Sequence, residues 1–141
     1  MSDVDATTEN EELARLLGGE LSEVAKFAAQ LLERTGAYSV LCPACGSGEC
    51  SAFLARRGFR VTAFDVSAHT CRRVTRTAGL LGVQVESFSD DIITPRRQLR
   101  QFDAIFSHNT LHQMRPSQRH ALLCSFYRAL RMGGILVVSV L

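Results

Sequence analysis

Residues 38–67 read YSVLCPACGSGECSAFLARRGFRVTAFDVS, and this stretch decides how the rest of the chain folds. It opens with a short apolar run at Tyr38–Leu41, which is typical of a buried strand in a parallel sheet. A glycine-containing turn follows over residues 44–48, and then a helical pattern that Gly58 ends. A second apolar strand, Val61–Phe64, leads directly into an acidic residue. This order of elements predicts half of a nucleotide-binding α/β unit.

The turn and the acidic residue suit a ligand that lies against the main chain. Glycine has no Cβ, so the backbone can approach a ligand closely at Gly46 and Gly48. The helix that follows offers its first N–H groups to the same ligand. Asp65 comes 17 residues after Gly48, where a carboxylate can accept hydrogen bonds from both hydroxyls of a ribose.

Two common nucleotide-binding patterns do not fit this turn. A dinucleotide fingerprint, G-x-G-x-x-G, requires a third glycine at position 51, which is Ser51. No Gly-Lys-Ser/Thr sequence follows the glycines, which excludes a P-loop that would cradle phosphates.

The pattern instead resembles motif I of the class I S-adenosylmethionine-dependent methyltransferases, D/E-x-G-x-G-x-G. Ala44, Gly46 and Gly48 occupy its three glycine positions. Four further segments resemble that family in the correct order, and the resemblance covers about residues 22–141. These segments are Asp65-Val66-Ser67, Ser89–Ile92, Phe102–His112 and Arg128–Gly134.

The resemblance implies a Rossmann-like α/β fold, a doubly wound parallel sheet in strand order 3-2-1-4-5 that lacks the usual carboxy-terminal β hairpin. The alternation of strands and helices along the chain independently predicts a parallel sheet with right-handed crossovers. The resemblance also implies S-adenosylmethionine as the cofactor, no metal, and binding residues at the carboxyl ends of the strands. The implied cofactor-binding residues are Ala44, Cys45, Gly46, Ser47, Gly48, Asp65, Val66, Asp90, Asp91, Ile92, Ser107, His108 and Asn109.

For the chemistry, the resemblance implies direct displacement at the sulfonium methyl group by a nucleophile. A general base is needed only when that nucleophile must first lose a proton. His108 and His112 follow the fourth strand, where the methyl group should point, and are the candidate catalytic residues. For His112, packing or capping within the loop is the preferred interpretation, and His108 is equally expected to contact the cofactor.

Cys42 is the main departure from the family pattern. It stands where the family usually has Asp or Glu, which helps to hold the ammonium group of the cofactor. Loss of a charge-assisted hydrogen bond of roughly 1.5–3 kcal/mol would lower cofactor affinity by about one or two orders of magnitude. A proline follows Cys42. In this feature the sequence resembles the thiopurine- and tellurite-resistance-type branches of the family, which modify small molecules.

The spacing Cys42-Pro43-Ala44-Cys45 also matches a thioredoxin-like redox pair. In such a pair a helix begins within the motif, whereas here Gly46 to Gly48 delay it, so a redox function is disfavoured. Three cysteines spaced C-x2-C-x4-C, without a second pair or a nearby histidine, are weak evidence for zinc.

The chain divides into an acidic tail with a short helix at residues 1–19 and a methyltransferase-like domain at residues 20–141, with truncation after strand five as an alternative. The second helix is predicted at Glu20–Thr35. Ser67 is a good N-cap for the helix after Asp65, Pro95 favours one helical turn, and the fifth strand is predicted at Ile135–Val140, after Gly133-Gly134. No basic, apolar leader and no long apolar window is present, so we expect no membrane contact and a cytoplasmic location. The fifth strand would form an open edge, which a homodimer or another partner could cover.

The arginines leave a second class of function open. Residues 1–35 carry eight acids and three bases, whereas residues 36–141 carry six acids and thirteen arginines. Clusters such as Arg72/Arg73/Arg76 can follow phosphates, although arginines also line the solvent face of helices.

Three hypotheses therefore stand. The first is a methyltransferase that acts on a small-molecule acceptor. The second is a module that binds the cofactor without turnover and needs a partner. The third is an RNA methyltransferase that uses the arginine clusters.

Overall fold

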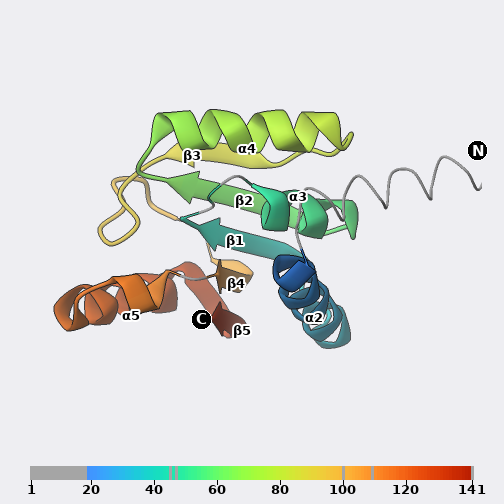
Figure 1. Cartoon of the computed structure of the whole chain (residues 1–141). Helices are drawn as coiled ribbons and strands as arrows, with labels where there is room; N and C mark the ends of the chain where they lie inside the picture. Colours follow the sequence, from blue (N-terminus) through green and yellow to red (C-terminus); the bar gives the residue numbers. More distant parts are fainter. Residues whose placement is uncertain (1–18, 45, 47, 100, 109, 141) are drawn as a thin grey trace, which may run out of the picture.

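The structure is a computed structural model, and it describes residues 19–44, 46, 48–99, 101–108 and 110–140. Within these residues lies a five-stranded sheet in the order β3-β2-β1-β4-β5, with every neighbouring pair parallel (Figure 1). The predicted α/β class and strand order are therefore confirmed. The short helix expected near the amino terminus lies outside the described residues. The strands are β1 (Ser39–Pro43), β2 (Arg60–Asp65), β3 (Glu86–Ser89), β4 (Phe102–His108) and β5 (Leu130–Ser139), and the helices are α2 (Gly19–Thr35), α3 (Glu49–Arg56), α4 (Ala68–Leu80), the 3-10 turn η1 (Leu111–Gln113) and α5 (Pro116–Ala129).

Two apolar clusters, one on each face of the sheet, form the core. The first joins α2, α3 and α4 to Val40 of β1, and the second joins α5 to the neighbouring Leu41. Successive side chains of a strand point to opposite faces, so these two adjacent residues enter different clusters. In Figure 1, α4 runs beside β3 and β2 at one edge of the sheet, and α5 lies near β5 at the other. This is the doubly wound arrangement that the alternating sequence pattern predicts.

The helix that follows Asp65 begins as predicted. The Ser67 hydroxyl caps α4 by accepting the backbone N–H of Thr70 at 3.2 Å. Three inward residues of this helix are buried, namely Cys71, Val74 and Ala78.

Two local predictions are wrong. The helical turn expected after Pro95 is absent from residues 95–99, where the backbone N–H groups of Arg96 and Arg97 instead bond the carboxylate of Asp90. The fifth strand starts at Leu130, before the glycine pair at 133–134, and not after it.

The early start of β5 is possible because the strand carries a bulge. Pairing steps from Phe102↔Leu130 to Ala104↔Ile135, so five positions of β5 oppose two of β4. A Cβ at Gly134 would lie 2.8 Å from the carbonyl oxygen of Arg131, so this position of the bulge requires glycine.

Asp103 ties three strands together at the amino end of the sheet. Its Oδ2 accepts the backbone N–H groups of Tyr38 at 2.8 Å and Ser39 at 3.0 Å, and its Oδ1 accepts Nε of Arg131 at 2.6 Å. The hydrogen bonds from Ser39 and Tyr38, followed by the Arg131 guanidinium, lower the pKa of Asp103 from 3.8 to about 2. A carboxyl whose pKa is lower in the folded state stabilises the fold above its unfolded pKa and loses that contribution as the pH falls.

We therefore expect Asp103→Asn to lower the free energy of unfolding at pH 7 by about 1–2 kcal/mol, allowing for partial exposure of the pair. The difference from the unmodified chain should shrink as the pH falls from 4 towards 2, because the native carboxyl is then protonated as well. Urea unfolding at pH 7, 4 and 3 measures this effect. Glu86→Gln, which removes an exposed carboxylate, is the control. A pH-independent difference would contradict the assignment.

Candidate cofactor site

The turn after β1 lies beside the end of β2. Pro43 pairs with Phe64 in the sheet, and the backbone N–H of Ala44 donates to the Phe64 carbonyl at 2.8 Å. Ala44 has φ 52°, a left-handed backbone conformation that is uncommon for a residue with a Cβ. The turn is thereby held next to Asp65, the residue that follows Phe64 and ends β2.

Gly46 and Gly48 both have positive φ, 57° and 87°, but their surroundings differ. A Cβ built on Gly48 would lie 2.8 Å from the Cα of Val74, so this glycine lets the turn pack against α4. A Cβ built on Gly46 meets no described atom within 4 Å. Gly48 is therefore needed for packing, whereas the backbone at Gly46 faces open space. Cys45 and Ser47, two of the expected binding residues, lie outside the described residues.

One of the two carboxylate oxygens of Asp65 forms a hydrogen bond within its own chain. Oδ1 accepts the backbone N–H of Ser67 at 3.0 Å, which orients the side chain at the start of α4. No described residue bonds the second oxygen, and the side chain is half-buried. A carboxylate held this way keeps an acceptor for a ligand hydroxyl. The next residue, Val66, is 71% exposed and offers an apolar surface beside it.

The end of β3 lies next to Asp65, because the backbone N–H of Asp90 donates to the Asp65 carbonyl at 2.9 Å. The buried Asp90 carboxylate accepts the N–H groups of Asp91, Arg96 and Arg97. Burial alone would raise the pKa of Asp90, but these hydrogen bonds outweigh it and the pKa is lowered. Asp90 thus organises the following loop with both of its oxygens.

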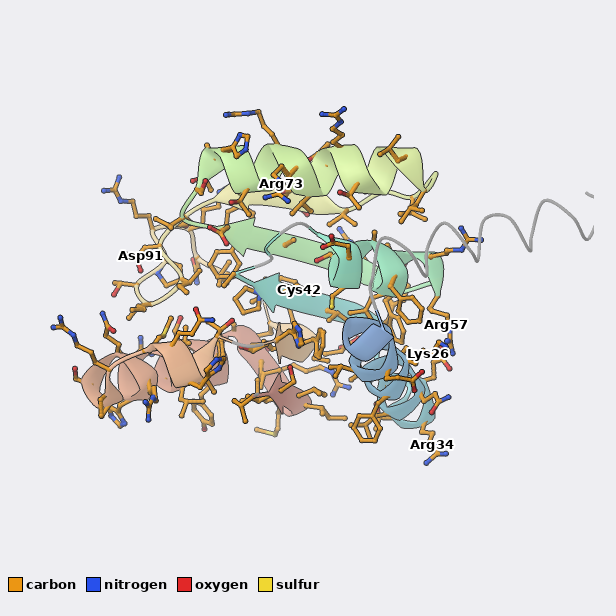
Figure 2. The ribbon with its side chains drawn as sticks, viewed as in Figure 1. Lys26, Arg34, Cys42, Arg57, Arg73 and Asp91 are labelled. Atoms are coloured by element: carbon orange, nitrogen blue, oxygen red, sulfur yellow. The ribbon has the colours of Figure 1, made fainter. Side chains whose placement is uncertain are left out.

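Asp91 is exposed, and its Oδ1 accepts the N–H groups of Ile93 and Thr94 at 2.8 and 2.9 Å. Figure 2 shows Asp91 on the loop beside the carboxyl ends of the strands. Ile92 is partly buried against the second apolar cluster. The loop after β3 therefore lies next to Asp65 and Val66, and hydrogen bonds to Asp90 and Asp91 define its conformation.

Ser107 and His108 end β4 on opposite faces. Ser107 is fully buried, and its hydroxyl has no hydrogen-bond partner among the described residues. A buried polar atom without a partner is unusual and points to a missing ligand or water. The half-buried ring of His108 places Nδ1 2.5 Å from Oγ of Ser139 on β5. Burial lowers the pKa of His108. Asn109, the third expected contact of this strand, lies outside the described residues.

The environment of His112 differs from that of Ser107 and His108. It is exposed on the short turn η1, whereas His108 lies on the strand itself. The structure therefore distinguishes two histidines that the sequence presents as similar candidates. The sequence alone did not identify Ser139 as a neighbour of His108, because no local pattern shows which residue of β5 will lie opposite that histidine.

Cys42 occupies the acid position of the family pattern as a neutral group. Its side chain is buried in the centre of the sheet (Figure 2). Burial, opposed by a hydrogen bond with Ser51, raises the pKa of Cys42 to about 12. Such a thiol is protonated at neutral pH and is a poor nucleophile, so the geometry disfavours the redox-pair interpretation. In the described part of the chain no group of three or more potential metal ligands is found.

A cavity of about 570 Å³ lies elsewhere. It is lined by the first residues of four strands, Ser39, Arg60, Glu86 and Phe102, together with Arg97 and others. These residues mark the amino ends of the strands, whereas ligands of open α/β sheets bind at the carboxyl ends. We therefore do not assign this cavity to the cofactor.

A parallel sheet in this order, with an open glycine turn, an aspartate after β2 and an exposed valine beside it, is typical of Rossmann-like folds that bind an adenosyl cofactor. A profile of the family described as "Methyltransferase domain" matches residues 40–134. The chain therefore belongs to the methyltransferase domain family, whose cofactor is S-adenosylmethionine.

Solved structures support the same fold. The S-adenosylmethionine-dependent methyltransferase from Clostridium acetobutylicum has a TM-score of 0.76 at 16% identity, over 84% of this chain and 50% of that one. The sugar N-methyltransferase KedS8 from a Streptoalloteichus species has a TM-score of 0.71 at 21% identity, over 83% and 47%. A protein that converts a disulfide bond into a thioacetal group during echinomycin biosynthesis has a TM-score of 0.71 at 25% identity, over 79% and 47%.

This chain thus spans about half the length of these solved relatives. A search of curated proteins finds no match. No helix in the described residues is both long and apolar enough to cross a membrane.

Proposed function

We propose that this chain binds S-adenosylmethionine at the carboxyl edge of its sheet and transfers the methyl group to a small-molecule nucleophile. The observation that carries the proposal is the pairing of an open turn at Gly46 with the half-engaged carboxylate of Asp65. When bound, the cofactor supplies a sulfonium methyl group and a neutral thioether as the leaving group.

The residues of the chain provide binding and orientation. Asp65, whose Oδ1 already accepts the Ser67 N–H, would accept hydrogen bonds from the ribose, and the exposed Val66 would cover one side of the adenine. The Ser107 hydroxyl, which has no hydrogen-bond partner among the described residues, offers one hydrogen bond from inside the sheet. His108, which ends β4 at the same edge of the sheet, would lie on the side from which the methyl acceptor approaches. Fixing two reactants in line accounts for much of the rate enhancement expected of such a site.

A small-molecule acceptor is favoured over RNA because several arginines already have partners within the described structure. Arg57 bonds both carboxylate oxygens of Glu33 at 3.0 Å, and Arg131 bonds Asp103. Figure 2 shows Arg57 near α2 and Arg73 on α4, apart from one another. These two cationic groups therefore do not form one continuous track for a phosphate backbone.

A second candidate function is cofactor binding without turnover. It is favoured by Cys42, which is neutral where the family has a carboxylate, and by β5, which is the outermost strand of the sheet among the described residues. A partner, or a second copy of the chain, could complete the acceptor site along that edge.

Calorimetric titration tests the proposal. We expect one molecule of S-adenosylmethionine to bind per chain, and S-adenosylhomocysteine to compete for the same site. Transfer of labelled methyl from the cofactor to thiols, phenols and amines then separates the two candidates, because the second predicts binding without transfer. Absence of binding of either compound would contradict both. RNA binding that falls steeply with salt would favour the RNA alternative.

A further inference from the structure

The cavity at the amino ends of the strands has a volume of about 570 Å³. Sites that bind small molecules measure about 300–1,000 Å³, so its size suits such a ligand. Arg60 and Thr62 lie two positions apart on β2 and therefore share one face of the sheet. Glu86 and Phe88 are related in the same way on β3, and Glu86 pairs with Thr62 in the register. One face of β2 and β3 thus forms the floor of the cavity.

The crossover from β3 to β4 explains why this floor is accessible. A crossover between parallel strands usually contains a helix, which packs on the sheet. Residues 90–99 and 101, the described part of this crossover, form no helix. Helix α5 packs on the same face as Phe88, but it lies near β5, at the opposite edge of the sheet (Figure 1). The crossover therefore borders the cavity with Arg97, Gln98 and Leu99 and leaves the space above the floor open.

The cavity carries an excess of positive charge. Two arginines, Arg60 and Arg97, and one acid, Glu86, line it. Within the described residues, no salt bridge joins either guanidinium to an acidic side chain. Arg131, by contrast, pairs with Asp103 at 2.6 Å. Two guanidinium groups without an acidic partner are available to an anion, and their planar donors match the oxygens of carboxylate and phosphate groups.

Arg97 and Thr62 are held in place by their own surroundings. The guanidinium carbon of Arg97 lies 4.3 Å from the centre of the Phe88 ring, and the backbone N–H of Arg97 donates to Oδ2 of Asp90 at 3.0 Å. Thr62 is 7% exposed, and among the described residues its hydroxyl has no hydrogen-bond partner. A buried hydroxyl that borders a cavity without a protein partner points to a ligand or water in that cavity. Binding to groups that are already ordered costs less conformational entropy.

We propose that this cavity is a second binding site, for a small organic oxyanion whose carboxylate or phosphate group is held by Arg60 and Arg97. The Thr62 hydroxyl donates to the same group from the floor of the cavity. Leu99 and Phe102, which are half-buried and also line the cavity, contact the apolar part of the ligand. The site goes beyond the proposed function, because the cofactor is placed at the carboxyl edge of the sheet.

Amide NMR of the nitrogen-15-labelled chain tests the proposal with three probes of similar size, namely phenyl phosphate, benzoate and the neutral benzyl alcohol. We expect both anions to shift the amide signals of Thr62, Phe88 and Gln98, with a Kd of about 0.1–1 mM. Benzyl alcohol should bind at least about 10-fold more weakly, because it lacks the charge that the guanidinium groups recognise. The tighter of the two anions identifies which acidic group the site prefers. Absence of shifts at these amides with both anions would overturn the proposal.

Variants of the lining residues give the second readout. Arg60→Gln and Arg97→Gln should each weaken binding of the tighter anion at least about 10-fold, and Thr62→Val, which keeps the side-chain shape, about 2- to 10-fold. Arg73→Gln is the matched control, because it removes the same charge from α4, which packs on the other face of the sheet, and should leave the affinity unchanged. An equal loss in Arg73→Gln would indicate a general effect of net charge and would reject the site. Unchanged affinity in both Arg60→Gln and Arg97→Gln would reject it as well.

Saturating S-adenosylhomocysteine gives the third readout. The proposed cofactor site and the cavity lie at opposite ends of the strands, so we expect the anion to bind with the same Kd in its presence. Competition would place the anion in the cofactor site and contradict the proposal. None of these measurements requires methyl transfer, so failure of this inference is distinguishable from failure of the proposed function.

Discussion

Asp65→Asn is expected to weaken the binding of S-adenosylhomocysteine by roughly 10- to 150-fold, which corresponds to about 1.5–3 kcal/mol. Asparagine has the same shape, and its carbonyl oxygen can still accept the N–H of Ser67, so the start of α4 is preserved. What is lost is the negative charge that strengthens the hydrogen bonds from the ribose hydroxyls. The substitution therefore separates cofactor binding from folding.

Calorimetry with the variant measures this effect, and thermal unfolding checks that the fold is retained. Glu86→Gln is the control, because it removes the same charge from the opposite, amino end of the sheet and should leave affinity unchanged. Equal loss in both variants would indicate a general effect of net charge and not a contact. Unchanged affinity in Asp65→Asn would remove Asp65 from the site.

Gly48→Ala is expected to destabilise the fold by about 2–5 kcal/mol, a large part of the 5–15 kcal/mol that holds a typical domain. Two costs add. The left-handed backbone, φ 87°, costs an L-residue roughly 1–2 kcal/mol. The new Cβ would also stand 2.8 Å from the Cα of Val74, and such overpacking costs about 1–3 kcal/mol.

Gly46→Ala is the matched comparison in the same turn. It incurs the left-handed cost of roughly 1–2 kcal/mol, but its Cβ meets no described atom, so the loss of stability should be smaller. Its methyl group would instead occupy the space into which we place the cofactor. We therefore expect Gly48→Ala to lower the urea midpoint most and Gly46→Ala to lower cofactor affinity most. If both variants lost stability equally and bound the cofactor normally, the two roles would be wrongly assigned.

The alternation of buried residues made the strands and their faces predictable. Val40 and Leu41 enter different apolar clusters, as a period of two residues requires. The glycine positions of the turn were also visible in the sequence. The different roles of Gly46 and Gly48 were not visible, because Val74, the neighbour of Gly48, lies 26 residues away in the sequence and contacts it only when α4 packs against the turn.

The acids show the same limit. The sequence placed Asp65 and Asp90 at the ends of neighbouring strands, and the structure joins them through the Asp90 N–H and the Asp65 carbonyl. The sequence did not reveal that the Asp90 carboxylate would be occupied by the N–H groups of Asp91, Arg96 and Arg97. A short-range pattern identifies which residue types follow a strand. The path of a loop depends on which acceptors its backbone N–H groups can reach for hydrogen bonds.

The sequence by itself determined the fold class and the strand order implied by its motifs, and it also indicated the edge of the sheet at which we propose that the cofactor binds. Hydrophobic period, glycine turns and helix caps are encoded over a few residues, so they can be read locally. Only the tertiary structure decided that His108 meets Ser139, that Cys42 is buried and neutral, and that β5 begins with a bulge. These features depend on strand register and packing between distant segments, which no local pattern specifies.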